Sequence, residues 1–360
     1  LFGVVDKAGK SVVNNEYTTY LYRGPVLLLR SLSLNDCAVV VKDSSDAGYT
    51  AYTFGVDEPI IVQADNGYGI ISPRNQSIVA DFIYDSVHEY IPGSVYCLQK
   101  GAYKYLYADD RLSVKYHDVI AGPDNAYFVV KHEDDHGVIS YTGKMLAECS
   151  YSTYLDRGPA ALLRADASTD WVVVVKDGSD EGSTVYTFGE KDPIIAKSDK
   201  GYGIISPRNQ SIIADFVFNS IEEYIPGSVY CLQKGEHKYL YADDRLSVQY
   251  EDVIPDQEKD YFVVKMAGLY GVVNQTGNVV VDTKYATYLN RGPVLLLQHH
   301  SLTNWVVVAK DDSQTGYSVY TFEAGAPVAF NGEKMKASKI IEKLNEIGGK
   351  NGIGILNLVE

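Results

Sequence analysis

Cysteine is scarce in this chain, and the spacing of its four cysteines does not suggest disulfide bonds that would stabilise the fold. They lie far apart, and none belongs to a C-x-x-C pair: Cys37, Cys97, Cys149 and Cys231. Cys97 and Cys231 occupy matching VYCLQK segments, so we expect them to be buried thiols rather than disulfide partners. The sequence implies no disulfide framework.

Long apolar runs and clusters of positive charge are also missing. No apolar run approaches the roughly 20 residues needed to cross a bilayer, so we expect no membrane insertion. The net charge is −15 and no Lys/Arg cluster interrupts it, which argues against nucleic acid and anionic lipid as partners. Calcium, cationic groups and neutral sugars remain compatible with such a surface.

Sequence motifs of catalysis are absent too. The seven histidines have no counterparts one repeat further along, and the chain holds no G-x-S-x-G, H-E-x-x-H or P-loop. We therefore expect a protein that is not an enzyme, with no catalytic residues and no cofactor.

Repetition at a fixed spacing dominates what is present. The tripeptide Arg-Gly-Pro begins at Arg23, Arg157 and Arg291, each 134 residues after the last. The segment GYGIISPRNQSI, which contains Gly69 and then Gly203, follows the same interval. Such a period is the signature of a tandem array, in which most residues serve packing between neighbouring units.

Each period divides again into two halves. GVVDKAGKSVV from Gly3 has the layout of GIISPRNQSIV from Gly69, and further starts follow at Gly137, Gly203 and Gly271. Five units of roughly 67 residues result. We therefore predict a β-repeat pair at 1–134, a second pair at 135–268, a partial repeat at 269–321 and a separate tail at 322–360.

The local pattern within a unit predicts strands. Short apolar segments such as PVLLLR and AVVVKD alternate with Gly-, Asp- and Ser-rich segments such as KDSSDAG. We predict an all-β fold of tandem β-hairpin repeats in an open or partly closed array. A β-propeller is the alternative, although its blades commonly repeat every 40–50 residues.

These repeats resemble the bacterial WG-repeat family, whose units read aromatic-Gly-Val-Ile-Asp-x-x-Gly. Tyr270-Gly271-Val272-Val273 with Gly277 and Tyr285 is the nearest match, and Phe, Tyr or His136 replaces the family's Trp throughout. The resemblance implies a β-hairpin scaffold without an agreed chemistry. We expect a location at the bacterial cell surface or outside the cell rather than in the cytoplasm.

The pattern changes from Phe322 onward. Four apolar residues share one helical face: Ile340, Ile341, Leu344 and Ile347. Gly348 and Gly349 predict the end of the helix, and a strand is expected at 355–359. This β-turn-α-β tail suits a cap over the edge of the last hairpin, with docking onto a partner as the alternative.

The tail resembles a segment of argininosuccinate synthase, an ATP-dependent ligase, through PVAFNGEK, IIEKLNEIGGK and GIG followed by VE. The resemblance implies a citrulline-binding role for Glu360, but Ile355 and Asn357 replace an Arg and an Asp of the family. The nucleotide loop of that family, S-G-G-L-D-T-S, is absent, so we expect no ligase activity.

Three acidic turns that recur with the period are weak calcium candidates, because hard cations bind clustered oxygens. They begin at Asp43, Asp177 and Asp311, and the third copy carries Gln314 in place of an acid. The bidentate Glu of a calcium loop is missing, so we interpret them as hairpin turns. No metal site is predicted.

Weak binding candidates are the residues that recur with side chains suited to recognition. They are Arg23, Arg157, Arg291, Trp171, Trp305, Tyr68 and Tyr202. The arginines could bind an anion or hold their own turns, and the tryptophans, at the position of Cys37, could form a platform or pack in the core. The 30 tyrosines could pair across strands or form a binding face.

Together these observations predict a non-enzymatic repeat scaffold that binds a protein or glycan through an extended Tyr-rich face. The alternative is a structural protein whose repeats or tail self-associate into oligomers or fibres.

Overall fold

The computed structural model describes residues 1–33, 35–179, 182–311 and 315–350, and it divides the chain into two compact units, Leu1–Glu190 and Lys191–Glu360. Strands make up 61% of the chain and helix 4%, so the predicted all-β class is confirmed. The single described α-helix is too short and too polar to cross a membrane.

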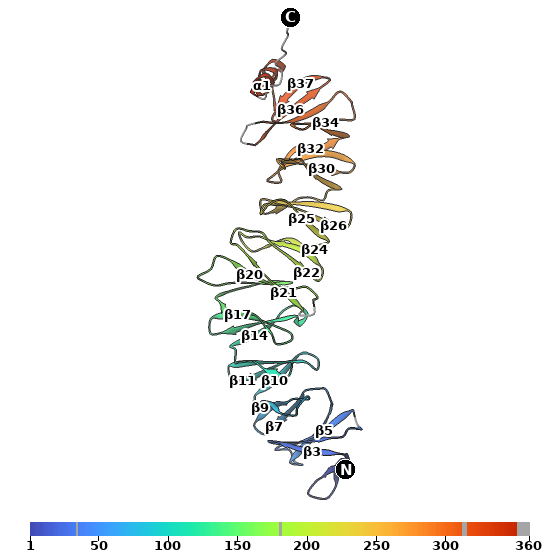
Figure 1. Ribbon diagram of the computed structural model, residues 1–360, viewed down its shortest axis with the longest axis vertical. Helices are drawn as coiled ribbons and strands as arrows, with labels where there is room; N and C mark the ends of the chain where they lie inside the picture. The colour runs from blue at the N-terminus through green and yellow to red at the C-terminus, as the bar shows by residue number, and fades with distance from the viewer. Residues whose placement is uncertain (34, 180–181, 312–314, 351–360) are drawn as a thin grey trace. The chain divides into compact units, whose positions relative to one another are not determined.

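Unit 1 contains six antiparallel sheets, each built from consecutive strands (Figure 1). Their strands are β1 (Phe2–Val5) and β2 (Ser11–Tyr17); β3 (Thr19–Arg23), β4 (Val26–Arg30), β5 (Asp36–Lys42) and β6 (Tyr49–Gly55); β7 (Ile60–Ala64), β8 (Gly67–Ile71) and β9 (Ile78–Tyr84); β10 (Ser86–Ile91), β11 (Val95–Lys100), β12 (Tyr103–Ala108) and β13 (Arg111–Leu112); β14 (Asp118–Ala121), β15 (Tyr127–His132), β16 (Asp135–Ser140) and β17 (Met145–Tyr151); β18 (Thr153–Arg157), β19 (Ala160–Arg164), β20 (Trp171–Lys176) and β21 (Ser183–Phe188). A 3₁₀ turn, Pro123–Asn125, joins β14 to β15.

Unit 2 contains four antiparallel sheets of the same kind. Their strands are β22 (Ile194–Ser198), β23 (Gly201–Ile205) and β24 (Ile212–Phe218); β25 (Ser220–Ile225), β26 (Val229–Lys234), β27 (His237–Ala242) and β28 (Arg245–Leu246); β29 (Asp252–Pro255), β30 (Tyr261–Met266), β31 (Leu269–Asn274) and β32 (Val279–Tyr285); β33 (Thr287–Asn290), β34 (Val294–Gln298), β35 (Trp305–Lys310), β36 (Tyr317–Glu323), β37 (Ala326–Phe330) and β38 (Glu333–Lys334). Among the described residues, no sheet of either unit closes into a barrel.

Within a unit, successive sheets pack face to face. In unit 1, Leu28 and Val39 of sheet β3–β6 share a core with Ile71 of β8. Ile70, the preceding residue, packs on the opposite face against Leu98 of the next sheet. Because adjacent strand residues point to opposite faces, a strand between two sheets must be apolar on both sides. This explains short continuous runs such as GYGII.

Each predicted unit of roughly 67 residues corresponds to about two sheets. The predicted boundary at 134/135 falls in the turn between β15 and β16, which are paired strands of one sheet. The two compact units divide between Glu190 and Lys191. The repeats of the sequence therefore do not begin where the sheets begin. The glycine near the start of each repeat lies in a middle or penultimate strand of its sheet.

That glycine lies where a neighbouring backbone or aromatic ring approaches closely. Opposite Gly203 the β23–β24 register shifts, and a Cβ added at Gly203 would lie 2.6 Å from the ring of Phe216. The same register shift accompanies the matching glycines Gly3, Gly69, Gly137 and Gly271. The motif thus marks a bulge that leaves no room for a side chain.

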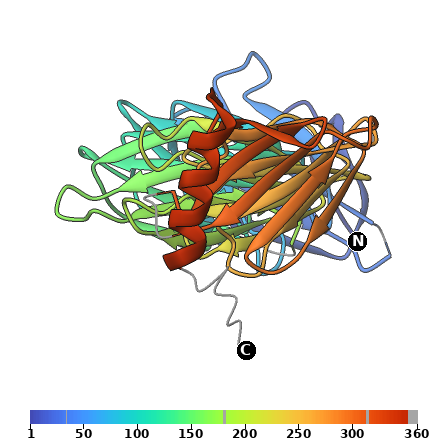
Figure 2. The same cartoon turned by 90° about the horizontal axis from the view of Figure 1, so that it is seen from above.

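The tail adds to the last sheet. β37 pairs with the outer edge of β36, and α1 (Ala337–Lys350) packs beside β37, as Figures 1 and 2 show. Ile340 is fully buried there, whereas Ile341, expected on the same face, is 48% exposed.

The predicted helix end at Gly348 and Gly349 is wrong, since α1 continues to Lys350. A glycine costs a helix only about 1 kcal/mol relative to alanine, which does not by itself end it. The Ile347 side chain and the strand predicted at 355–359 lie outside the described residues.

Candidate functional site

A cleft of about 590 Å³ in unit 1 is formed by turns at one end of successive sheets. Its lining comes from the turns after β6, β8, β10, β12 and β16. The lining residues are Asp57, Pro59, Pro73, Arg74, Gly93, Ser94, Tyr107, Asp109, Asp110, Tyr141 and Thr142. Because each turn belongs to a packed sheet, the cleft is built on a rigid frame.

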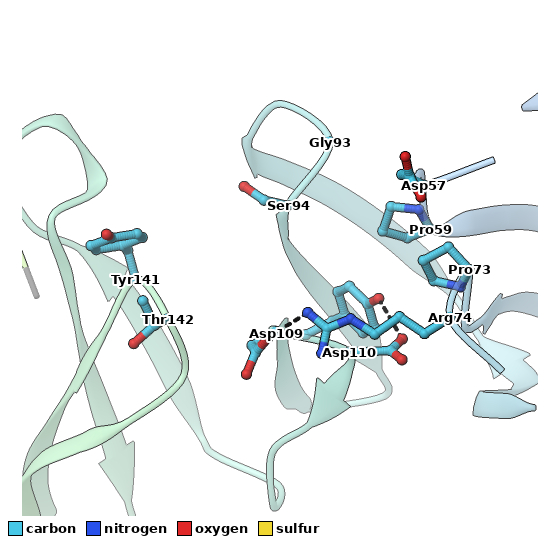
Figure 3. Close-up of a pocket in the computed structure, with 11 residues that line it drawn as sticks. Asp57, Pro59, Pro73, Arg74, Gly93, Ser94, Asp109, Asp110, Tyr141 and Thr142 are labelled. Carbon is cyan, nitrogen blue, oxygen red and sulfur yellow. Dashed lines mark hydrogen bonds and ion pairs between the residues drawn. The ribbon is translucent and has the colours of Figure 1, made fainter. Parts of the chain in front are cut away.

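An ion pair across two turns forms one wall of the cleft. Arg74, after β8, donates from Nη2 to Oδ1 of Asp109, after β12, over 2.7 Å (Figure 3). This hydrogen bond raises the pKa of Arg74, so the guanidinium stays charged. Both side chains are about half exposed or more, so the pair contributes little stability. It fixes the position of the two charges.

Asp110 is held more firmly beside it. Its two carboxylate oxygens accept hydrogen bonds from Ser72 Oγ, at 2.5 Å, and from the Tyr107 hydroxyl, at 3.1 Å. Ser72 and Tyr107 are buried, and burial raises the pKa of the Tyr107 hydroxyl. Asp109 and Asp110 both have positive φ, which aspartate tolerates in a tight hairpin turn. The turn therefore ties one sheet to the preceding one.

The opposite side of the cleft carries groups suited to recognition. Tyr141 and Thr142, in the turn after β16, lie across the opening from Arg74, and Asp57 and Ser94 border it from other turns (Figure 3). The site thus combines an aromatic ring, hydroxyls, carboxylates and one guanidinium. Such groups can bind a polar, hydroxyl-bearing ligand.

Unit 2 repeats the frame of this cleft but changes two of its lining residues. Arg208 donates to Asp243 over 2.7 Å, and Asp244 accepts from Ser206 and Tyr241, as in the first period. Lys191 and Gln275 replace Asp57 and Tyr141. The frame therefore serves the fold in both units, and the two variable positions carry what is specific to the first cleft.

A second polar cluster lies at the end of β35 in unit 2. The Lys310 ammonium is within 2.6 Å of Asp256, 2.9 Å of Glu258 and 3.4 Å of Asp260. Burial alone would lower the pKa of Lys310, but hydrogen bonds to Asp256 and Glu258 outweigh it and raise that pKa. The three acids come from the segment between β29 and β30 and neutralise the cation at the end of β35, so we interpret the cluster as structural.

The three predicted arginines lie in or directly after strands of three different sheets. Arg23 ends β3 and donates from Nε to the carbonyl oxygen of Gln76 over 2.6 Å, bracing the next sheet's turn. Arg157 ends β18 and donates to the carbonyl oxygen of Asp156. Arg291 follows β33 and is exposed. The first two support turns, which is the structural interpretation of the motif.

The predicted aromatic residues are largely packed between strands. Trp171 is 2% exposed, and the Arg164 guanidinium lies 4.6 Å from the centre of its ring. Trp305 is half-buried and donates to the carbonyl oxygen of Leu302. Tyr68 and Tyr202 are half-buried against the cores of their sheets. Trp171 therefore lies in the core, whereas the other three keep part of their surface accessible.

The weak calcium candidates Asp43, Asp177 and Asp311 each follow the third strand of a sheet. Asp43 accepts hydrogen bonds from Ser45 Oγ, from Thr50 Oγ1 and from the backbone nitrogen of Ser45, and these bonds lower its pKa. Asp177 accepts from Ser179 and Thr184, and Asp311 accepts from Ser318. In the described part of the chain no three His, Cys, Asp or Glu side chains gather as a metal site. Gln314 lies outside it.

Sequence reasoning missed the cleft, although a signal for it was present. SPRN and ADDR recur together in both periods, with Arg74–Asp109 and Arg208–Asp243 each 35 residues apart. A conserved distance between two turns within the repeat indicates a contact. The Lys310 cluster carries a weaker signal, since its acids have no full counterpart one period earlier.

Comparison with known proteins finds a match at the C-terminal end. Residues 299–360 match the family described as "Arginosuccinate synthase C-terminal domain". Argininosuccinate synthase of Lachnoclostridium phytofermentans is 68% identical over 40 residues, 11% of this chain and 10% of that protein. The Agathobacter rectalis enzyme is 54% identical over 44 residues, covering 12% and 11%. The chain spans about a tenth of these relatives, and Glu360 lies outside the described residues.

Solved structures give weaker likenesses. Dihydro-heme d1 dehydrogenase NirN has a TM-score of 0.21 and 9% identity, with 76% of this chain and 73% of that chain covered. Citrobacter koseri AztD has a TM-score of 0.19 and 9% identity, with 91% and 93% covered. Scores this low support no conclusion about fold or function.

Proposed function

We propose that the chain is a non-enzymatic repeat scaffold that binds a protein or glycan partner in the cleft of unit 1. The observation that carries the proposal is that one cleft is lined by Tyr141 and Thr142 on one side, by Asp57 on the other, and by Ser94 from a further turn (Figure 3). A tyrosine ring can stack on a sugar or a peptide plane while hydroxyls and carboxylates fix its polar groups.

The acids of the cleft favour a supporting role over catalysis. Asp109 is paired with Arg74, and both oxygens of Asp110 accept hydrogen bonds from the scaffold. A general acid or base needs a group that can exchange a proton with a ligand. The same hydrogen bonds recur in unit 2, as expected for turns that stabilise the fold.

The cleft replaces the extended tyrosine face in this proposal. Of the 30 tyrosines, those more than a third exposed are Tyr20, Tyr22 and Tyr52. The others are buried or half-buried, mostly between strands and sheets, where they contribute packing. A continuous aromatic surface is therefore a weaker basis for binding than the cleft.

Binding of labelled chain to a panel of neutral glycans, together with capture of proteins at micromolar concentration, tests the proposal. We expect Tyr141→Ala to lower the affinity for the retained ligand by roughly tenfold or more, the usual effect of losing a central aromatic contact. The matched control is Gln275→Ala, at the same position in unit 2. No retained ligand, or equal binding by Tyr141→Ala, would refute the proposal.

Self-association is the second candidate, and an exposed aromatic group favours it. Phe2, Tyr20 and Tyr22 are 43%, 52% and 66% exposed, and their rings meet edge to face with centres 4.8 and 6.2 Å apart. Light scattering over a concentration series separates the candidates. Growth in mass that Tyr20→Ser with Tyr22→Ser removes supports assembly, and a constant mass contradicts it.

We also infer that the repeats are divergent members of the WG-repeat type. The support is the shared aromatic-Gly pair, whose glycine faces a bulge in five sheets. The aromatic residue, or His136, is paired each time with Tyr or Phe of the next strand. The tail's likeness to argininosuccinate synthase covers too little of that enzyme to support its activity here. Incubation with ATP, citrulline and aspartate should release no pyrophosphate.

A further inference from the structure

The outer edge of β6 in unit 1 is regular and carries no charge. β6 pairs with β5 through seven successive residue pairs without a register shift, from Asp36–Gly55 to Lys42–Tyr49. Its sequence, YTAYTFG, contains no charged residue and no proline. Among the described residues, no strand pairs with its other edge. Sheets usually protect such an edge with charges, prolines or bulges.

The matching strand of the third period is occupied at this same edge. β36, YSVYTFE, lies two periods after β6, and β37 pairs with its outer side. Asn331 donates its backbone N–H to the Val319 carbonyl over 2.7 Å, and the Val319 N–H donates to Asn331 Oδ1 over 2.6 Å. The chain therefore contains both an occupied and an open form of one edge.

Burial of one tyrosine shows what the added strand does. Tyr320 of β36 is opposite Phe330 of β37, with ring centres 5.1 Å apart, and it is fully buried. Tyr52, at the same position of β6, is 37% exposed. At the open edge of β6 the Tyr52 ring is thus accessible, whereas in the third period the Phe330 ring covers the equivalent Tyr320.

The backbone of β6 offers the matching hydrogen bonds. In an antiparallel ladder, alternate residues direct both N–H and C=O to the same neighbour. Val319 directs its groups outward to Asn331, and Ala51 is its equivalent in β6. Tyr49, Ala51 and Thr53 therefore direct their amides away from β5.

We propose that the outer edge of β6 binds an extended strand of a partner protein. The partner segment is uncharged, runs antiparallel to β6 and places an aromatic side chain over Tyr52, as β37 does over Tyr320. Main-chain hydrogen bonds supply affinity and the aromatic contact supplies selectivity. This site is separate from the cleft and does not depend on it. β21, STVYTF, is likewise the last strand of its sheet, but its tyrosine is less exposed.

A synthetic peptide with the sequence of residues 323–334, EAGAPVAFNGEK, is the probe, because it contains the strand that pairs with β36. We expect its addition to slow hydrogen exchange in residues 49–55 of the full chain. Ala51→Pro removes one outward N–H and should weaken peptide binding about five- to tenfold, the effect of one lost backbone hydrogen bond. Ala51→Val, the residue found at this position in β21 and β36, should bind normally.

A second variant keeps the test valid if Ala51→Pro disturbs the fold. Tyr52→Ser leaves the backbone intact and should weaken binding of the peptide. Replacing the phenylalanine of the peptide by serine should weaken binding as well. Unchanged exchange in residues 49–55, or equal binding by all variants, would overturn the proposal. Concentration-dependent self-association through residues 49–55 without peptide binding would overturn it too. Tyr141→Ala should leave peptide binding unchanged, which separates this site from the cleft.

Discussion

At the scale of single residues, the glycine of each repeat explains why the motif is so regular. Gly203 lies opposite a bulge, and any side chain there would enter the ring of Phe216. Its neighbours are fixed by a packed sheet on each side, so they have little freedom to move away.

Gly203→Ala should therefore destabilise unit 2 by about 1–3 kcal/mol, the usual cost of overpacking. Gly349→Ala is the control, since a Cβ there meets nothing within 4 Å and alanine favours a helix. Urea unfolding followed by circular dichroism measures both. Equal stability of the Gly203→Ala variant and the parent would contradict the close approach.

Lys310 shows how much a buried charge depends on its partners. Asp256 is 2% exposed at its side chain, so removing the cation would leave a buried carboxylate without its neutralising partner. We expect Lys310→Met to cost about 3–5 kcal/mol. Lys339→Met breaks only the exposed pair with Glu342 and should leave stability nearly unchanged. Chemical denaturation would refute the account if the two variants lost the same stability.

At the scale of elements, the tail and the turns hold sheets in place by different means. α1 contributes buried apolar area beside β37, whereas the Arg208–Asp243 pair links two turns electrostatically. The first contribution is insensitive to pH, and the second depends on ionisation.

Ile340→Ala should destabilise the last sheet by about 2–5 kcal/mol, because it removes a fully buried side chain. Ile341→Ala, one residue further along the same helix and 48% exposed, should change stability by less than about 1 kcal/mol. Hydrogen exchange in β36 and β37 reports the local effect. Equal loss of stability in both variants would contradict the packing described for α1.

Acid should weaken the turn-to-turn link in unit 2. The hydrogen bond and charge of Arg208 lower the pKa of Asp243 in the folded state. The link is therefore fully present above the ordinary carboxyl range and is lost as pH falls through the lowered folded-state pKa. Melting temperature measured from neutral to acid pH should fall more for the parent than for Asp243→Asn. Parallel curves would count against an ionised pair.

At the scale of the whole molecule, the period of 134 residues predicted much of the fold. It predicted strands, tight turns and the equivalent places of Cys97 and Cys231, because those depend on local pattern and repetition. It did not indicate how many sheets a unit holds, because a strand buried on both faces, such as GYGII, is apolar throughout and does not show which sheet covers which face.

The cleft and the helix end could not be predicted from local pattern either. In the sequence, Asp109 looks like an ordinary turn residue, because only the fold brings Arg74 next to it. Gly348 looks like the end of a helix, because the sequence does not show how the helix packs. The sequence indicated that aromatic residues matter, but burial decides which of them face water. Only Tyr20, Tyr22 and Tyr52 reach the surface to a large extent among the described tyrosines.

The central claim is that consecutive sheets bury their faces against each other, and the four cysteines test it most directly. All four are free; Cys37, Cys97 and Cys231 are buried, Cys149 is half-buried, and burial raises the pKa of each thiol. Pulse alkylation of the native protein, read residue by residue by mass spectrometry, should modify Cys149 first. Cys97 and Cys231 should react alike and only on unfolding. Labelling of either at the rate of an unstructured thiol would contradict the stacked arrangement.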